Sequence, residues 1–145
     1  MSTLLKFSIE SNSETPARTE IKTRGFKLIV DEPEALGGTN LAPNPVEYIL
    51  AGYAGCINVV AHLTAKKFNI DLKDLKIAID GDINPARLFG ESYNDRAGYK
   101  NINVRLSTTS AIDEKIKAQW LEEIENRCPV NDTLRNSTPI NFSLN

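Results

Sequence analysis

The sequence predicts an α+β fold in which an antiparallel sheet packs on two long helices. Two segments, residues 44–68 and 110–128, repeat apolar side chains with the helical period. Several shorter segments alternate apolar and polar residues as strands do, and they occur in runs rather than alternating strictly with helices. With 145 residues and no evident linker or repeat, the chain is expected to form one domain spanning residues 1–145.

The composition is that of a soluble globular protein, with 41% hydrophobic and 25% charged residues. A net charge of -2 and the absence of a basic run argue against nucleic-acid binding. No stretch of about 18 residues is wholly apolar and uncharged, so no membrane span is expected. The first residues lack the basic and apolar regions of a secretory signal, and with only two cysteines the chain is expected to be cytoplasmic.

The N-terminal part predicts a meander of three strands. The strand candidates are residues 5–9, 18–23 and 26–30. A polar turn at 11–16 would separate the first two, and a tight turn at Arg24 and Gly25 would join the last two. Residues 31–45 are rich in Gly, Pro and Asn and predict a loop that leads to the first helix.

The long helix predicted at residues 44–68 has a clear start. Asn44 is a favourable N-cap, and Glu47 can reach back to it. Gly52 and Gly55 lie inside the helix and should each cost about 1 kcal/mol relative to alanine. We therefore expect another backbone to pack closely against these glycines, and the helix to be buried and central.

The second half of the chain predicts further strands and two helices. The strand candidates are residues 75–79, 102–106 and 140–144. A polar loop at 81–99 separates the first two and is too long for a tight hairpin. Ser110 is expected to cap the second helix, and Cys128 and Pro129 to end it and begin a short helix. The apolar stripe of the second helix consists of Ile112, Ile116, Trp120, Leu121 and Ile124.

The two cysteines are the evident redox groups. Cys56 lies in the middle of a helix, outside the reach of the helix dipole, so it needs a neighbouring cation to become a nucleophile. Cys128 would cap the short helix, whose free N–H groups favour a thiolate. A thiolate can reduce a peroxide and become a sulfenic acid, which a second thiol converts to a disulfide. Alternatively, Cys56 is a small core residue, since free cysteine is often buried.

Three segments together resemble the OsmC/Ohr family of thiol-dependent hydroperoxide peroxidases, and are most similar to its broad OsmC-like branch. They are DEPEALGG at 31–38, NPVEYILAGYAGC at 44–56 and CPVNDTL at 128–134. The resemblance implies an intertwined homodimer with two long central helices and active sites at its interface. It implies Cys56 as the reactive cysteine and Cys128 as the resolving cysteine. It further implies an organic hydroperoxide as substrate, a dithiol as reductant and no cofactor.

The resemblance also implies an Arg–Glu pair beside the reactive thiol. Arg18 stands roughly where the family's arginine is expected, and Arg24 is the second choice. The family's glutamate usually stands ten positions before the reactive cysteine, where this chain has Val46. Glu47, one position later, projects to the opposite side of the helix from Cys56, because each residue advances the helix by about 100°. Glu47 is therefore better interpreted as a cap residue.

Other residues give weaker signals. Tyr53, one turn before Cys56, could contact a bound substrate or be a core tyrosine. His62 is the only histidine and has no partner at ligand spacing, so no metal site is predicted. The glycine pair beginning at Gly37 lacks the Lys-Ser/Thr ending of a phosphate loop, so nucleotide binding is unsupported.

Two functions remain open from the sequence. The first is a peroxidase with Cys56, Cys128 and Arg18 as catalytic residues and Tyr53 at the substrate. The second is a non-catalytic dimeric binding protein with structural cysteines, which Val46 in place of the acid favours. A structural disulfide is disfavoured because thiols in the cytoplasm are normally reduced.

Overall fold

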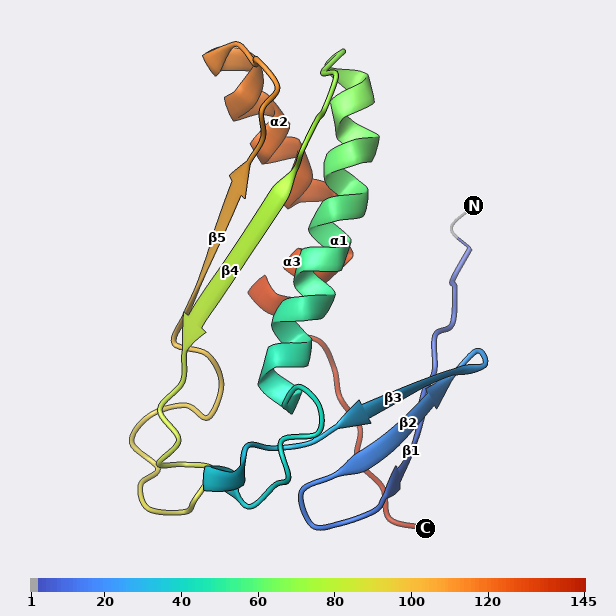
Figure 1. The fold of residues 1–145 in the computed structure, drawn as a ribbon, viewed down its shortest axis with the longest axis vertical. Helices are drawn as coiled ribbons and strands as arrows, with labels where there is room; N and C mark the ends of the chain where they lie inside the picture. Colours follow the sequence, from blue (N-terminus) through green and yellow to red (C-terminus); the bar gives the residue numbers. More distant parts are fainter. Residues whose placement is uncertain (1–2) are drawn as a thin grey trace. The chain divides into compact units, whose positions relative to one another are not determined.

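The structure is a computed structural model that describes residues 3–145. Its elements are β1 Glu10–Ser13, β2 Thr19–Thr23, β3 Phe26–Val30, the 3₁₀ turn η1 Glu34–Leu36, α1 Pro45–Lys67, β4 Lys76–Asp82, β5 Asn101–Ser107, α2 Glu114–Arg127 and α3 Pro129–Arg135 (Figure 1). Two antiparallel sheets and their helices confirm the α+β class. The chain divides into two compact units, Met1–Ile49 and Leu50–Asn145. The expectation of one domain stays a prediction.

The N-terminal unit contains the antiparallel sheet β1-β2-β3. Arg24 and Gly25 form the turn between β2 and β3 with φ values of 47° and 87°, which suits a two-residue hairpin of right-handed twist. This turn was predicted, but the strand expected at residues 5–9 was wrong. The first strand is instead β1, which pairs through its backbone with β2 from Glu10 to Ser13. The apolar side chains before it are exposed, so alternation there does not mark a buried face within the chain.

The loop after β3 is organised around the buried carboxylate of Asp31. This carboxylate accepts hydrogen bonds from the Thr39 hydroxyl at 2.6 Å, from the Leu41 N–H at 3.1 Å and from the Glu32 N–H at 2.8 Å. Gly38 is required at its position because an added Cβ would lie 1.9 Å from the Glu32 carbonyl oxygen. The predicted loop is therefore closely packed rather than loose.

Acid should remove the stabilising effect of Asp31. The hydrogen bond from Thr39 is the largest cause that lowers the pKa of Asp31 to about 2. Because this folded-state pKa is depressed, the ionised group stabilises the fold above its ordinary pKa of about 4, and this contribution disappears as the pH falls through about 2. We expect Asp31→Asn to lower the melting temperature by several degrees near neutral pH, with the difference closing in acid.

Thermal unfolding followed by circular dichroism over a pH series measures this difference. Glu34→Gln, in the exposed part of the same loop, is the control for removing a carboxylate. A difference between Asp31→Asn and the wild type that does not change with pH would contradict the assignment.

Helix α1 begins with the predicted reciprocal cap. The Asn44 side chain accepts the Glu47 N–H at 2.9 Å, and the Glu47 carboxylate accepts the Asn44 N–H at 2.8 Å. The buried residues of α1 all lie on one face: Tyr53, Ile57, Val60, Ala61, Thr64 and Ala65. By length and composition alone α1 could cross a membrane, a test that the core helix of a soluble protein also passes.

The expectation that α1 is buried and central holds for one face of the helix in the described chain and is wrong for the other. Val59 and Leu63 are 57% and 52% exposed on the face opposite the core. A Cβ added at Gly52 or Gly55 would meet nothing within 4 Å. The close packing partner expected for these glycines is therefore not another part of the described chain.

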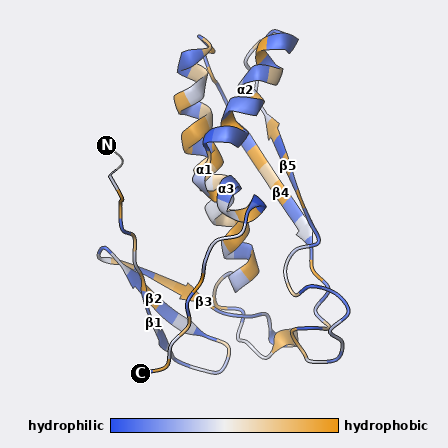
Figure 2. Ribbon diagram, turned by 180° about the vertical axis from the view of Figure 1, so that it is seen from behind, coloured by the Kyte–Doolittle hydropathy of each residue, from blue (hydrophilic) through white to orange (hydrophobic). Residues whose placement is uncertain are grey.

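The C-terminal unit packs β4 and β5 against the helices (Figure 1). The two strands pair antiparallel from Lys76 and Ser107 to Asp82 and Asn101, and every second residue faces inward. Trp120 on α2 is 2% exposed, and its indole N–H donates to the Ala61 carbonyl at 3.1 Å. Figure 2 shows apolar residues along β4 and α1. The two predicted strands are confirmed, as are Trp120, Leu121 and Ile124 of the predicted stripe, whereas Ile112 packs on the core from the segment before α2.

Two further predictions about the second half were wrong. Helix α2 is capped by Asp113, whose carboxylate accepts the Lys115 and Ile116 N–H groups. Ser110 instead bonds to the segment before β4, because its hydroxyl accepts the Lys73 N–H at 2.7 Å. Residues 140–144 form no strand in the described chain, and their apolar side chains are exposed.

Candidate redox site

The structure brings the two cysteines together. Helix α1 carries Cys56, and Cys128 lies at the junction between α2 and α3. Their Sγ atoms are 2.9 Å apart, with the Cys128 thiol donating to the Cys56 sulfur. Both cysteines are free, and a disulfide bond between them would need a sulfur–sulfur distance of about 2.05 Å. The site is thus a pair of reduced thiols in direct contact.

The junction that holds Cys128 uses both its backbone and its side chain. The Cys128 N–H donates to the Ile124 carbonyl at 3.1 Å and completes α2. The Cys128 sulfur accepts the Asn131 N–H at 3.4 Å and caps α3, in which Pro129 takes the first position. Cys128 is 1% exposed, whereas Cys56 is half-buried. Cys56 is therefore the more accessible sulfur of the two.

The electrostatics of Cys128 differ from the expectation that its thiolate is favoured. Burial raises the pKa of the Cys128 thiol, and its hydrogen bond to Cys56 raises it further. The Asn131 N–H acts in the opposite direction but does not outweigh them. The helix start therefore does not activate this thiol, because the cost of burying a charge is larger.

A polar cluster that sequence reasoning missed lies beside the thiols. We call it the Asn131 cluster, and it consists of Tyr53, Glu125, Asn131 and Arg135. The Asn131 side-chain oxygen accepts the Tyr53 hydroxyl at 2.5 Å and the Arg135 Nε–H at 3.0 Å. The Asn131 side-chain nitrogen donates to the Glu125 carbonyl at 2.9 Å. The only local signal is the spacing of Asn131 and Arg135, which puts them one turn apart on α3.

Tyr53 is a buried member of this cluster. Burial raises the pKa of its hydroxyl, Arg135 opposes this effect, and Cys128 and Cys56 add to it. Tyr53 is therefore electrostatically coupled to both sulfurs. Its hydroxyl already has a protein partner, and its contact with a substrate stays a prediction.

Arg18 belongs to the N-terminal unit, where its contacts are defined. Its Nε–H donates to the Glu14 carboxylate at 2.9 Å, and its guanidinium donates to the Thr39 hydroxyl at 3.2 Å. Glu14 is thus the carboxylate that holds this arginine, a partner that sequence reasoning did not identify. Arg24 lies in the β2–β3 turn with its guanidinium 5.2 Å from the centre of the Phe26 ring. The role of either arginine at Cys56 stays a prediction.

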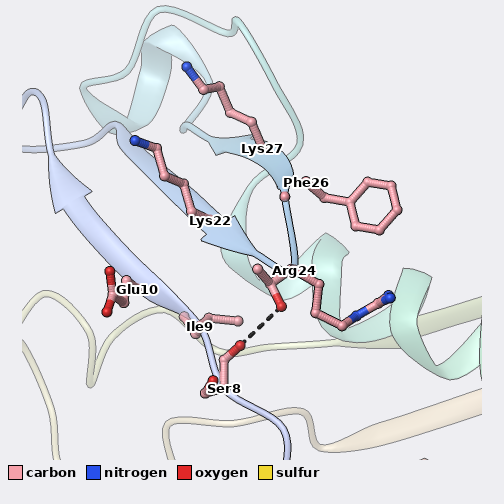
Figure 3. A pocket seen from close by; sticks show the side chains of 9 residues that line it. Ser8, Ile9, Glu10, Lys22, Arg24, Phe26 and Lys27 are labelled. Atoms are coloured by element: carbon pink, nitrogen blue, oxygen red, sulfur yellow. Dashed lines mark hydrogen bonds between the residues drawn. The ribbon is translucent and has the colours of Figure 1, made fainter.

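The remaining candidates are His62, a possible metal site and a surface hollow. His62 is exposed, and its Nδ1 lies 2.8 Å from the Asn58 carbonyl. Within residues 3–145 no three His, Cys, Asp or Glu side chains gather as metal ligands would. A hollow of about 340 Å³ lies at the β2–β3 turn (Figure 3). It is lined by Ser8, Ile9, Glu10, Lys22, Thr23, Arg24, Gly25, Phe26 and Lys27 and contains neither cysteine.

The protein thus combines an α+β fold with a pair of free thiols in contact, Cys56 and Cys128. The chain belongs to the OsmC-like protein family, whose model matches residues 38–143. Among curated proteins, no sequence match was found.

Solved structures agree with this membership. An OsmC-like protein from Mycoplasma pneumoniae has a TM-score of 0.77 at 20% identity, covering 90% of this chain and 88% of that chain. An organic hydroperoxide resistance protein OsmC from Legionella pneumophila has a TM-score of 0.68 at 20% identity, covering 92% of both chains. An organic hydroperoxide resistance protein from Elizabethkingia anophelis has a TM-score of 0.68 at 20% identity, covering 93% and 91%. At this identity the likeness establishes the fold.

Proposed function

We propose that the protein is a thiol-dependent peroxidase that reduces organic hydroperoxides. The observation that carries the proposal is the 2.9 Å contact between the Cys56 and Cys128 sulfur atoms. The fold is shared with two proteins named for organic hydroperoxide resistance, which supports this substrate class. We assign the protein to the cytoplasm, where reducing conditions keep such thiols free between turnovers.

The two cysteines take different roles because their exposure differs. The half-buried Cys56 is the thiol that meets the substrate, and the enclosed Cys128 resolves the product. The Cys56 thiolate attacks one peroxide oxygen, the O–O bond breaks, and protonation gives an alcohol and a sulfenic acid on Cys56. The Cys128 sulfur then attacks the Cys56 sulfur, forming a disulfide and releasing water. An external dithiol reduces the disulfide and restores both thiols.

Arg18 is our candidate for the cation that Cys56 needs. An adjacent guanidinium favours the thiolate over the thiol, and a carboxylate partner fixes the direction of the guanidinium. Glu14 supplies that partner within the N-terminal unit. It provides a carboxylate even though Val46 occupies the position of the family's glutamate.

Stopped-flow measurement of hydroperoxide consumption tests the proposed function. Reduced protein should consume tert-butyl hydroperoxide much faster than free cysteine does and form one disulfide per chain. A rate no higher than that of free cysteine would reject the proposal. It would favour the alternative, a non-catalytic dimeric binding protein in which Cys56 reacts slowly with alkylating reagents.

We also propose that the protein is a homodimer in which the exposed face of α1 packs against its copy. The apolar side chains of Val59 and Leu63 are exposed on this face, and space is open above Gly52 and Gly55. Small residues let two helices approach closely, which would offset the cost of glycine in a helix. The dimer would thereby cover the face of α1 that the single chain leaves open.

A charge on the exposed face of α1 should prevent association. Val59→Glu would place a carboxylate in the proposed interface, where leaving a charge unpaired is unfavourable. We expect a monomer by analytical ultracentrifugation at a concentration where the wild type is a dimer. Ala118→Glu, on the exposed side of α2, is the matched control and should remain dimeric. A Val59→Glu protein that stays dimeric would contradict this interface.

A further inference from the structure

The contact between the two sulfurs depends on where α3 begins. Helix α3 has only seven residues, and Cys128 forms its N-cap. Helices this short are unstable by themselves, so α3 must be held by its surroundings. Asn131, in the first turn of α3, is 5% exposed and is the buried residue of this helix. Its side chain is therefore the evident anchor for the turn that carries Cys128.

The hydrogen bonds of Asn131 join the elements that carry the two sulfurs. Its side-chain nitrogen donates to the Glu125 carbonyl on α2 and so fixes the junction between α2 and α3. Its side-chain oxygen accepts the Tyr53 hydroxyl from α1. Tyr53 precedes Cys56 by three residues, and Asn131 follows Cys128 by three residues. The Tyr53–Asn131 bond therefore bridges the same two elements as the sulfur–sulfur contact.

Two other contacts fix the direction of the Asn131 amide. The Arg135 Nε–H donates to the same oxygen as Tyr53. The Asn131 side-chain nitrogen faces the Glu125 carbonyl oxygen, which can only accept a hydrogen bond. Turning the Asn131 amide by 180° would place its oxygen against that carbonyl oxygen, so that two acceptors would face each other. The Glu125 carboxylate in turn holds Arg135 at 3.1 Å. The Asn131 cluster thus has one consistent arrangement of donors and acceptors.

We propose that Asn131 is the positioning residue for disulfide formation, because its bonds to Tyr53 and Glu125 hold Cys128 in contact with Cys56. This inference rests on the proposed function and concerns its second step. In that step the Cys128 sulfur forms a bond to the sulfur of the Cys56 sulfenic acid, the S–O bond breaks, and water leaves. Holding the reactants in contact raises the effective concentration of one thiol at the other.

Two variants remove the anchor in different ways. Asn131→Ser removes the whole amide, whereas Tyr53→Phe removes one hydroxyl and keeps the ring in the core. Asn136→Ser, at the exposed end of α3, is the matched control for the first variant. Tyr48→Phe is the control for the second, since the Tyr48 hydroxyl on the same helix bonds to the Ile29 carbonyl. Thermal unfolding of all four checks that each chain is folded.

Rapid mixing with tert-butyl hydroperoxide separates the two chemical steps. We expect sulfenic acid formation on Cys56 to change less than about twofold in Asn131→Ser, and disulfide formation to slow about tenfold or more in both Asn131→Ser and Tyr53→Phe. Dimedone should then trap more sulfenic acid than in the wild type or in either control. The positioning role is overturned if disulfide formation is unchanged, or if both steps slow equally. A Tyr53→Phe protein slowed only in the peroxide step would instead assign this hydroxyl to the substrate.

A second measurement does not depend on peroxidase activity. The equilibrium of the Cys56–Cys128 disulfide with reduced and oxidised glutathione reports how well the fold holds the thiols together. We expect the equilibrium constant for forming the disulfide to fall about tenfold in both anchor variants and to stay unchanged in the controls. If the wild type consumes no hydroperoxide, the proposed function fails, yet this equilibrium still decides the role of Asn131. If the equilibrium constant for forming the disulfide is unchanged in both anchor variants, the positioning role of Asn131 is rejected.

Discussion

Replacing Cys56 with serine should reduce hydroperoxide consumption by about a thousandfold or more, to the background rate. Cys56 is the accessible member of the thiol pair, and a serine hydroxyl is not ionised at neutral pH. Cys128, which is buried, cannot replace it, because burial raises the pKa of its thiol. Single-turnover stopped-flow kinetics with tert-butyl hydroperoxide measure the loss.

Cys128→Ser is the matched control for this experiment. It should still consume about one equivalent of hydroperoxide and then stop, because the sulfenic acid on Cys56 has no thiol to condense with. Mass spectrometry should find that acid, trapped by dimedone, on Cys56. Full activity in Cys56→Ser would reject the assignment of roles. A first turnover that Cys56→Ser keeps and Cys128→Ser loses would reverse it.

Replacing Trp120 with alanine should cost about 3 to 5 kcal/mol of the free energy of unfolding. Trp120 is 2% exposed in the core between α1 and α2, and its indole N–H is bonded to the Ala61 carbonyl. Removing the ring leaves a cavity that the neighbouring helices can fill only in part. Urea denaturation at a fixed protein concentration measures the change, which should appear in the midpoint rather than in the slope.

Two comparisons make the Trp120 result specific. Trp120→Phe keeps much of the buried ring and loses the hydrogen bond to Ala61, so it should cost clearly less than the alanine variant. Gln119→Ala, on the exposed side of α2, should stay within about 0.5 kcal/mol of the wild type. A Trp120→Ala protein as stable as Gln119→Ala would show that the core is not packed around this ring.

The elements predicted correctly are those whose signals are local. Asn44 and Glu47 satisfy each other's backbone at the start of α1, and Arg24 and Gly25 close the β2–β3 turn. These interactions involve neighbours in the sequence, so the sequence contains all the information they need. The same holds for the start of α3, where a proline follows the capping Cys128.

The errors occur where the outcome depends on distant partners. Alternation at residues 5–9 and 140–144 describes segments able to form strands, but a strand needs a partner, and within residues 3–145 neither segment pairs with another strand. Ser110 and Asp113 are both able to cap a helix, and the bonds of Ser110 to Asp71 and Lys73 decide between them.

The candidate site was predicted only in part, because it too depends on residues that are far apart in the sequence. The roles of Cys56 and Cys128 as reactive and resolving cysteines rested on a resemblance and stay predictions; whether their sulfurs meet was left open, and the structure brings them into contact. The Asn131 cluster could not be predicted because its bonds join three helices at positions that share no periodic pattern. Glu14 as the partner of Arg18 is a local pair, but it falls in a turn where no helical spacing marks it.

The Cys128 sulfur accepts the Asn131 backbone N–H while its own proton points to Cys56. One atom therefore both caps a helix and is the resolving thiol of the proposed peroxidase reaction. A disulfide bond between Cys128 and Cys56 would remove the proton of the Cys128 thiol. It would also change the electron density on the sulfur atom that accepts the Asn131 N–H. The amide resonances in the first turn of α3 are thus a natural spectroscopic reporter, which follows oxidation of the pair without an added label.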